Sequence, residues 1–181
     1  MKIIPTKLPG VLIIEPVVYK DARGYFLEAF HEKRYSDEAG ITLPFVQDNR
    51  SRSVQNTLRG LHFQQKIPQG KFVQAVLGEI YDVVVDIKKG SPTFGQWVST
   101  NLSGENFRQI YVPPGYAHGF CVLSATADVE YKCTAFYDPT LEMSLLWNDP
   151  TLQIDWPIKN PILSKKDGEG KLLKDLLPLL S

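Results

Sequence analysis

The chain has 181 residues, of which 43% are hydrophobic and 22% are charged, and this composition is ordinary for a globular protein. The length suits a single domain over residues 1–181. Lys and Arg together number 20, as do Asp and Glu, so no net charge would draw the protein to nucleic acid or to an anionic membrane. The N-terminal segment lacks the apolar run of a signal peptide, and no stretch is apolar for long enough to span a bilayer, so we expect a cytoplasmic protein.

In chain order, the first predicted element is a helix over His31–Ala39, which Gly40 would terminate as a C-cap. Between residues 43 and 156, short β-branched or aromatic runs alternate with turn residues, a pattern typical of sandwiches and barrels. The predicted strands are Lys71–Leu77, Ile80–Ile87, Gln96–Leu102, Arg108–Val112, His118–Leu123, Asp128–Ala135 and Met143–Trp147.

Gly78 and Glu79 separate the two clearest strands, and the glycine could supply the positive φ of a tight hairpin between them. A terminal amphipathic helix is predicted over Lys171–Leu177, ending near Pro178. The predicted fold class is therefore all-β, as a jelly-roll barrel or double sheet with short peripheral helices.

Three histidines and two cysteines are the residues most able to carry chemistry. Cys121 and Cys133 lie in apolar strand patterns without a nucleophile motif, so we interpret both as packing residues. His31 opens a helix and is expected on the surface. His62 and His118 stand beside glycines at strand edges, where a metal site or a packed, hydrogen-bonded histidine are both possible.

The metal hypothesis is weakened by residue 64. Metal-binding barrels of this kind place His-x-His on one strand, but the residue that would follow His62 as second ligand is Gln64. We therefore expect no metal and no other cofactor. Strand alternation sends His62 and Gln64 to one face and Leu61 and Phe63 to the other. If His62 faces inward, an Asp or Glu is expected to fix its tautomer and raise its basicity.

Further polar residues interrupt the apolar strands, where an unpaired buried polar group would cost substantial free energy. Each alone fits a surface position, but together they predict a polar pocket whose Arg and Lys could bind a diphosphate. They are Gln47, Asn49, Arg59, Lys71, Glu130 and Tyr131.

Taken in order, a series of motifs along nearly the whole chain resembles the dTDP-4-dehydrorhamnose 3,5-epimerase family. The motifs that carry the resemblance are residues 21–28 (DARGYFLE), 47–51 (QDNRS), 58–64 (LRGLHFQ), 69–71 (QGK), 91–95 (SPTFG), 113–120 (PPGYAHGF), 131–132 (YK), 147–149 (WND) and 163–167 (LSKKD). No single motif is specific, whereas the ordered series is.

The resemblance implies a cupin-like jelly roll that forms a homodimer by exchanging N-terminal strands. It also implies the reaction: epimerisation of dTDP-4-dehydro-6-deoxy-D-glucose at C3 and C5 to dTDP-4-dehydro-L-rhamnose, a step in dTDP-L-rhamnose biosynthesis, without a cofactor. The implied partners are this dTDP-4-keto sugar and a second copy of the chain, with no nucleic acid and no membrane.

By the same resemblance, His62 is the base, Asp167 orients it, Tyr131 is the acid on the other face of the sugar, and Lys71 stabilises the enolate oxygen. His118 would line the sugar site. The implied contacts to the nucleotide and diphosphate are Arg23, Glu28, Gln47, Asp48, Asn49, Arg59, Glu142 and Lys166. Arg23 and Glu28 would reach into the cavity of the partner subunit.

The chain departs from the family pattern at two places, Arg50 and the short loop 65–70. Arg50 stands where His or Glu is expected, and we predict that it turns outward. Neither departure touches the implied acid or base, so they bear on fine specificity.

Alternatives remain open at this stage. A single-carbon epimerase or a 3,4-ketoisomerase would use the same barrel and base, although a ketoisomerase could dispense with an acid opposite the base. A non-catalytic sugar-nucleotide-binding barrel would need none of these groups, and a metal-dependent oxygenase would need ligands that the sequence lacks at position 64.

Overall fold

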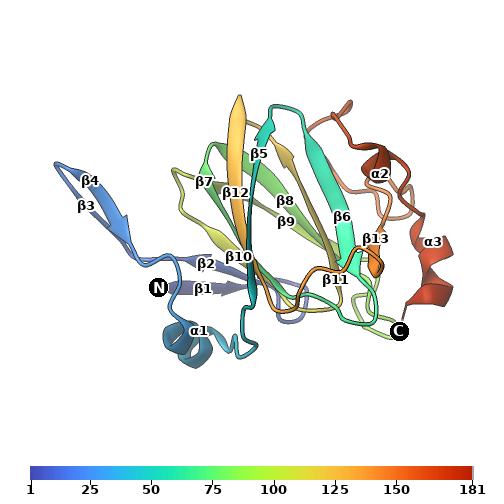
Figure 1. The fold of residues 1–181 in the computed structure, drawn as a ribbon, viewed down its shortest axis with the longest axis horizontal. Coiled ribbons are helices and arrows are strands. Elements are labelled where there is room, and N and C mark those ends of the chain that lie inside the picture. Colours follow the sequence, from blue (N-terminus) through green and yellow to red (C-terminus); the bar gives the residue numbers. More distant parts are fainter. Residues whose placement is uncertain (181) are drawn as a thin grey trace.

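The computed structural model describes residues 1–180 and consists chiefly of two facing antiparallel sheets (Figure 1). The six-stranded sheet has the order β1 (Lys2–Pro5), β2 (Leu12–Glu15), β10 (Gln109–Val112), β7 (Lys71–Leu77), β12 (Thr126–Cys133) and β5 (Gln47–Val54). The five-stranded sheet has the order β13 (Glu142–Ser144), β6 (Leu58–Gln64), β11 (Tyr116–Val122), β8 (Glu79–Asp86) and β9 (Trp97–Ser103). The predicted all-β double sheet is therefore confirmed.

Apolar side chains fill the space between the two sheets and also cover the outer face of the five-stranded sheet. Val73, Val84 and Val129 belong to the cluster between the sheets. Leu61 and Phe63 belong to a second cluster, which the C-terminal segment completes. Because successive strand residues point to opposite faces, His62 points away from this second cluster and into the space between the sheets, as the alternation predicts.

The helices are short and peripheral. They are α1 (Glu32–Ala39), α2 (Lys165–Gly168), α3 (Leu173–Leu176) and the 3₁₀ turn η1 (Leu177–Leu179). The first begins at the N-cap His31 and ends at Gly40 with φ of 67°, as predicted. The predicted terminal helix is shorter than expected and continues past Leu176 as η1, which includes Pro178. Within residues 1–180, no helix combines the length and apolarity that crossing a bilayer requires.

The predicted hairpin between β7 and β8 is wrong, because these strands belong to different sheets. β7 pairs with β10 and β12, whereas β8 pairs with β11 and β9. Gly78 does adopt a positive φ, 72°, but at a corner where the chain passes from one sheet to the other. A Cβ on this residue would overlap the carbonyl oxygen of Thr126 and the hydroxyl of Ser124.

A two-stranded hairpin, β3 (Val18–Asp21) and β4 (Gly24–Leu27), projects away from the body of the protein at the left of Figure 1. Its apolar side chains are largely exposed: Tyr19 by 64%, Tyr25 by 58% and Phe26 by 69%. Isolated hairpins are marginally stable, and exposed apolar patches of this kind mark interaction surfaces.

We predict that Gly78→Ala lowers the free energy of unfolding by about 2–4 kcal/mol, because it combines a strained φ with a clash against backbone. Gly90→Ala is the matched control, since Gly90 has a φ of 79° but no atom near its missing Cβ, and should cost only about 1–2 kcal/mol. Urea denaturation of both variants measures the difference. Equal losses would contradict the close approach at this corner.

Candidate active site

A polar cavity of about 410 Å³ lies between the two sheets, a size suited to a small-molecule ligand. Side chains from both sheets and from α2 line it. From the six-stranded sheet come Gln47, Asn49, Lys71 and Tyr131; from the five-stranded sheet come Arg59, His62, His118 and Glu142; and α2 supplies Lys166. The structure thus brings together most of the residues implied by the family resemblance.

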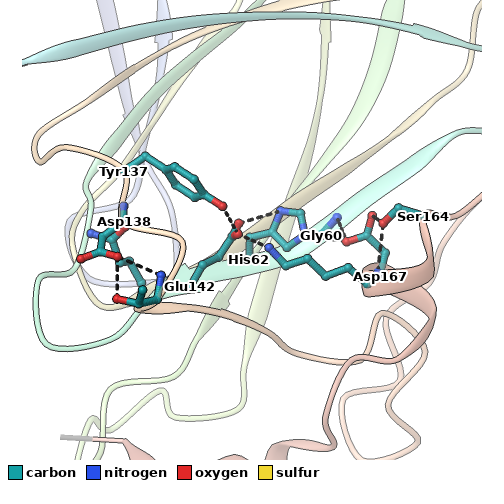
Figure 2. Close-up of polar contacts among 10 residues, drawn as sticks. Gly60, His62, Tyr137, Asp138, Glu142, Ser164 and Asp167 are labelled. Carbon is teal, nitrogen blue, oxygen red and sulfur yellow. Dashed lines mark hydrogen bonds and ion pairs between the residues drawn. The ribbon is translucent and has the colours of Figure 1, made fainter.

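His62 is held by the carboxylate of Asp167. Its Nε2 lies 2.5 Å from Asp167 Oδ1, and the Asp167 side chain is only 5% exposed (Figure 2). Burial opposes ionisation of Asp167, but hydrogen bonds from His62, Ser164 and the backbone of Gly60 outweigh it and hold the pKa below its ordinary value. The ionised carboxylate therefore accepts a hydrogen bond from Nε2–H, which leaves the lone pair on Nδ1.

Asp167 owes its position to α2, a single turn that sequence periodicity did not predict. Ser164 is the N-cap, and its hydroxyl oxygen accepts a hydrogen bond from the backbone N–H of Asp167. The same hydroxyl donates to Asp167 Oδ2 at 2.7 Å. The backbone N–H of Gly60 donates to Oδ1 at 3.3 Å, which ties α2 to β6 directly.

Glu142 lies on the opposite side of the His62 ring, with Oε1 4.0 Å from Nδ1 (Figure 2). Its Oε2 accepts a hydrogen bond from the Tyr137 hydroxyl at 2.6 Å and forms an ion pair with Lys166. Burial would raise the pKa of Glu142, but the hydrogen bonds from Lys166 and Tyr137 lower it below the ordinary value. Glu142 is therefore ionised at neutral pH.

Tyr131 enters the cavity from β12 and so faces it from the sheet opposite His62. Burial raises the pKa of its phenol above the ordinary value, which keeps the hydroxyl protonated at neutral pH. Burial also lowers the pKa of Lys71, against the nearby charges of Cys133, Glu142 and Asp82, which favour its protonated form. A phenolic donor and an amine thus occupy the wall facing the imidazole.

His118 stands directly across from His62 in the β6–β11 pairing. Its Nε2 lies 2.8 Å from Oδ2 of Asp82, a fully buried carboxylate on β8. Asp82 was not among the predicted site residues, although a carboxylate within the apolar run Ile80–Ile87 is a sequence signal for a buried polar partner. Each of the two cavity histidines is therefore hydrogen-bonded to an Asp carboxylate.

Some residues implied by the resemblance lie outside this cavity in the single chain. Arg23 is 90% exposed near the tip of the β3–β4 hairpin, and Glu28 pairs with Arg34. Asp48 points to the outer face of β5 and pairs with Lys132, because the alternation that turns Gln47 and Asn49 inward turns Asp48 outward.

The polar residues of β5 and β12 divide between the two faces of their sheet. Glu130 was expected in the polar pocket, but it pairs with Arg50 on the outer face instead. Arg50 therefore turns outward, as predicted. Cys121 and Cys133 are buried free thiols, as expected, although Cys133 also forms part of the cavity wall.

Gln64, which stands where metal-binding barrels have the second His of His-x-His, makes structural hydrogen bonds instead. Its amide nitrogen donates to the carbonyl oxygens of Ile67 and Phe136, and its oxygen accepts from the backbone N–H of Asp138. These bonds hold together two loops at the cavity. In the part of the chain that the structure describes, no group of three or more His, Cys, Asp or Glu side chains is arranged to hold a metal ion.

Tyr137, which lines the cavity and is 48% exposed, was also not predicted from the sequence. An exposed aromatic residue in a loop carries no periodic signal, so only the fold reveals its place beside Glu142.

Comparison with known proteins gives a consistent result. Residues 5–175 match the family model described as dTDP-4-dehydrorhamnose 3,5-epimerase. A dTDP-4-dehydrorhamnose 3,5-epimerase of Shigella flexneri is 50% identical over 97% of both chains. The crystal structure of a dTDP-6-deoxy-D-glucose-3,5-epimerase from Legionella pneumophila, in complex with dTDP-4-keto-L-rhamnose, is 55% identical with a TM-score of 0.93 and covers 96% of this chain and 93% of its own.

A 3'-monoepimerase from Streptomyces bikiniensis, solved in complex with dTDP-quinovose, is a more distant structural neighbour. It is 34% identical with a TM-score of 0.91, over 97% of this chain and 89% of its own. The same fold is therefore found with one-carbon and with two-carbon epimerases.

We predict that Lys71→Met raises the melting temperature, because it removes an amine whose protonated form burial disfavours. A lysine whose folded-state pKa lies below its unfolded value destabilises the fold at neutral pH, and this penalty disappears as the pH rises past about 10.4. Thermal unfolding at pH 7 tests the gain. Lys89→Met, at an exposed position, should leave the melting temperature unchanged; no gain at Lys71 would contradict the penalty.

Proposed function

The chain belongs to the dTDP-4-dehydrorhamnose 3,5-epimerase family of isomerases, and on that premise we propose that it inverts dTDP-4-dehydro-6-deoxy-D-glucose at C3 and C5 to dTDP-4-dehydro-L-rhamnose, a step in dTDP-L-rhamnose biosynthesis. The observation that carries the proposal is the placement of an Asp-bound imidazole on one wall of a cavity and a protonated phenol on the other. Inversion at carbon needs a base and an acid on opposite faces of the ring.

His62 is the base of the proposed reaction. The C4 ketone acidifies the hydrogens at C3 and C5, because the carbanion delocalises onto oxygen as an enolate. Asp167 holds the proton of Nε2, so Nδ1 is free to accept the proton from carbon. The ammonium of Lys71 stabilises the developing oxyanion more than the ketone, which lowers the barrier rather than tightening ground-state binding.

Tyr131 is the acid of the proposed reaction. Burial keeps its hydroxyl protonated until an enolate requires the proton, and β12 places it across the cavity from β6. Arg59, Gln47 and Asn49 lie along the same cavity and would contact the diphosphate and nucleotide. An Arg suits this task because its guanidinium can bind phosphate oxygens with two parallel hydrogen bonds.

A second copy of the chain is part of the proposal. The exposed aromatic residues of the β3–β4 hairpin need a surface to cover them, and Arg23 projects from the same hairpin. Exchange of this hairpin within a two-fold dimer would carry Arg23 and Glu28 to the cavity of the partner. A cytoplasmic location fits the two buried free thiols, which need no oxidising compartment.

A one-carbon epimerase is the alternative that the comparisons keep open, because the Streptomyces bikiniensis neighbour is a 3'-monoepimerase. It would use the same base and acid on a single carbon. The one-carbon and two-carbon epimerases differ in the number of carbons whose hydrogen exchanges with solvent.

Turnover in deuterated water, followed by NMR of the product, is the test of the reaction. We expect label at both C3 and C5. His62→Ala and Tyr131→Phe should each lower turnover by about 10²–10⁴ while still binding dTDP, because each removes one proton-transfer group. His31→Ala, at the exposed start of α1, is the matched control and should behave as wild type.

Label at one carbon only would establish the one-carbon epimerase instead. A wild-type protein that binds dTDP-sugars without any exchange would be a binding barrel, and the proposed reaction would be abandoned.

Complementation tests the exchanged dimer. We predict that Arg23→Ala and His62→Ala are each inactive alone but regain activity when unfolded and refolded together. A mixed dimer would contain one site with an intact His62 and an intact Arg23, so about a quarter of all sites would be restored after random pairing. Absence of recovery in a mixture shown to contain mixed dimers would refute the contribution of Arg23 in trans.

A further inference from the structure

Inversion at two carbons creates a proton imbalance that the enzyme must correct; the inference here rests on the proposed function. After the first inversion, His62 holds the proton taken from carbon and Tyr131 has given one up. A protonated imidazole cannot serve as a base. Unless His62 loses its proton while the sugar stays bound, the singly inverted sugar must leave before the second carbon can react.

The Nε2 side of His62 offers no exit for this proton. Nε2 already carries the hydrogen that it donates to Asp167. The Asp167 side chain is 5% exposed, and its oxygens also accept hydrogen bonds from Ser164 and Gly60. A proton passed to Asp167 would reach a closed, fully bonded carboxylate rather than solvent.

From Nδ1 of His62, a path toward solvent runs through the two carboxylate oxygens of Glu142. Glu142 Oε1 is 4.0 Å from Nδ1, a gap that one bridging water or a small rotation closes. Glu142 Oε2 accepts the Tyr137 hydroxyl at 2.6 Å, and Tyr137 is 48% exposed at the cavity mouth. Figure 2 shows His62, Glu142 and Tyr137 in this succession. The path ends at the surface: the side chain of His62 is 25% exposed, that of Glu142 is 14% exposed, and Tyr137 is 48% exposed.

The resting protonation states along this path are those that a relay needs. Glu142 is ionised in the resting site, because Lys166 and Tyr137 offset the effect of its burial, so it can accept a proton. The hydrogen bond to Glu142 raises the pKa of Tyr137 to about 12, so this phenol holds a proton that it can exchange rather than standing as a phenolate.

We propose that Glu142 and Tyr137 form a proton relay that resets His62 between the two inversions without release of the sugar. In the first step the Nδ1–H bond of the imidazolium breaks and a bond from the proton to Glu142 forms, leaving both groups neutral. In the second, Tyr137 gives its phenolic proton to water at the cavity mouth and takes the carboxyl proton in its place. Tyr131 regains its own proton from water, so one proton leaves and one enters.

A single-turnover experiment with enzyme in excess over sugar nucleotide tests the relay, with each inversion followed separately by rapid quench and NMR. In wild type the singly inverted sugar should not accumulate. Tyr137→Phe removes only the hydroxyl, and Glu142→Gln removes the acceptor. Tyr137→Phe should leave the first inversion nearly unchanged, and both variants should slow the second inversion relative to the first by roughly a hundredfold, the lower end of general acid–base effects.

Two controls separate a relay from a structural role. Lys165→Gln removes a neighbouring charge of α2 that is 87% exposed and pairs with Glu169 rather than Glu142, so it should preserve the wild-type ratio of the two rates. In Glu142→Ala, added formate should restore the second inversion in proportion to its concentration, whereas chloride at equal ionic strength should not. A variant that had lost only structural contacts would not be rescued by formate in this way.

The relay is refuted if Tyr137→Phe and Glu142→Gln keep the wild-type ratio, whether both inversions are fast or both are equally slowed. It is refuted also if Lys165→Gln changes the ratio as Tyr137→Phe does. Failure of the proposed function itself is recognised separately, because wild-type enzyme would then fail to invert both carbons.

Discussion

The hydrogen bond between His62 and Asp167 is the interaction on which the rest of the site depends. It joins the middle of β6 to a one-turn helix more than a hundred positions later in the chain, and no local structure would bring the two residues together. It decides which ring nitrogen carries the proton and which is free to act on a ligand. The C-terminal segment therefore positions a cavity side chain as well as packing against the sheet, because α2 supplies the carboxylate that binds His62 while α3 covers the outer apolar face of the same sheet.

That arrangement is possible because the five-stranded sheet is buried on both faces. Its outer face carries Leu61 and Phe63 against the C-terminal segment, while the inner face changes from apolar residues at one end to polar residues at the other. The apolar end fixes the distance between the sheets, and the polar end leaves a cavity lined from both walls. An imidazole on one sheet and a phenol on the other are thus held apart by the packing of the whole double sheet, which is rigid compared with any loop-borne site.

The sequence predicted the fold class, α1 and most of the strands, because alternation and turn residues are local signals. The two-residue period also predicted correctly that His62 lies opposite Leu61 and Phe63. It could not predict which strands pair: Gly78 has the conformation of a turn glycine, yet the chain changes sheets there, and that choice is made by long-range packing. Nor could it find α2, which is too short for periodicity, or Tyr137, which stands in a loop. The partnership of His62 with Asp167 came from family resemblance, whereas that of His118 with Asp82 emerged only from the structure.

The central claim is that a sugar ring lies between Nδ1 of His62 and the hydroxyl of Tyr131, so that a proton leaves by one face and returns by the other. The most direct measurement is a crystal structure of the Tyr131→Phe variant with the dTDP-4-keto sugar bound. We expect C3 and C5 to lie between the two side chains, with both hydrogens directed at Nδ1 and the C4 oxygen beside Lys71. A ring with both side chains on the same face, or with Nε2 released from Asp167 and directed at the carbon, would contradict it.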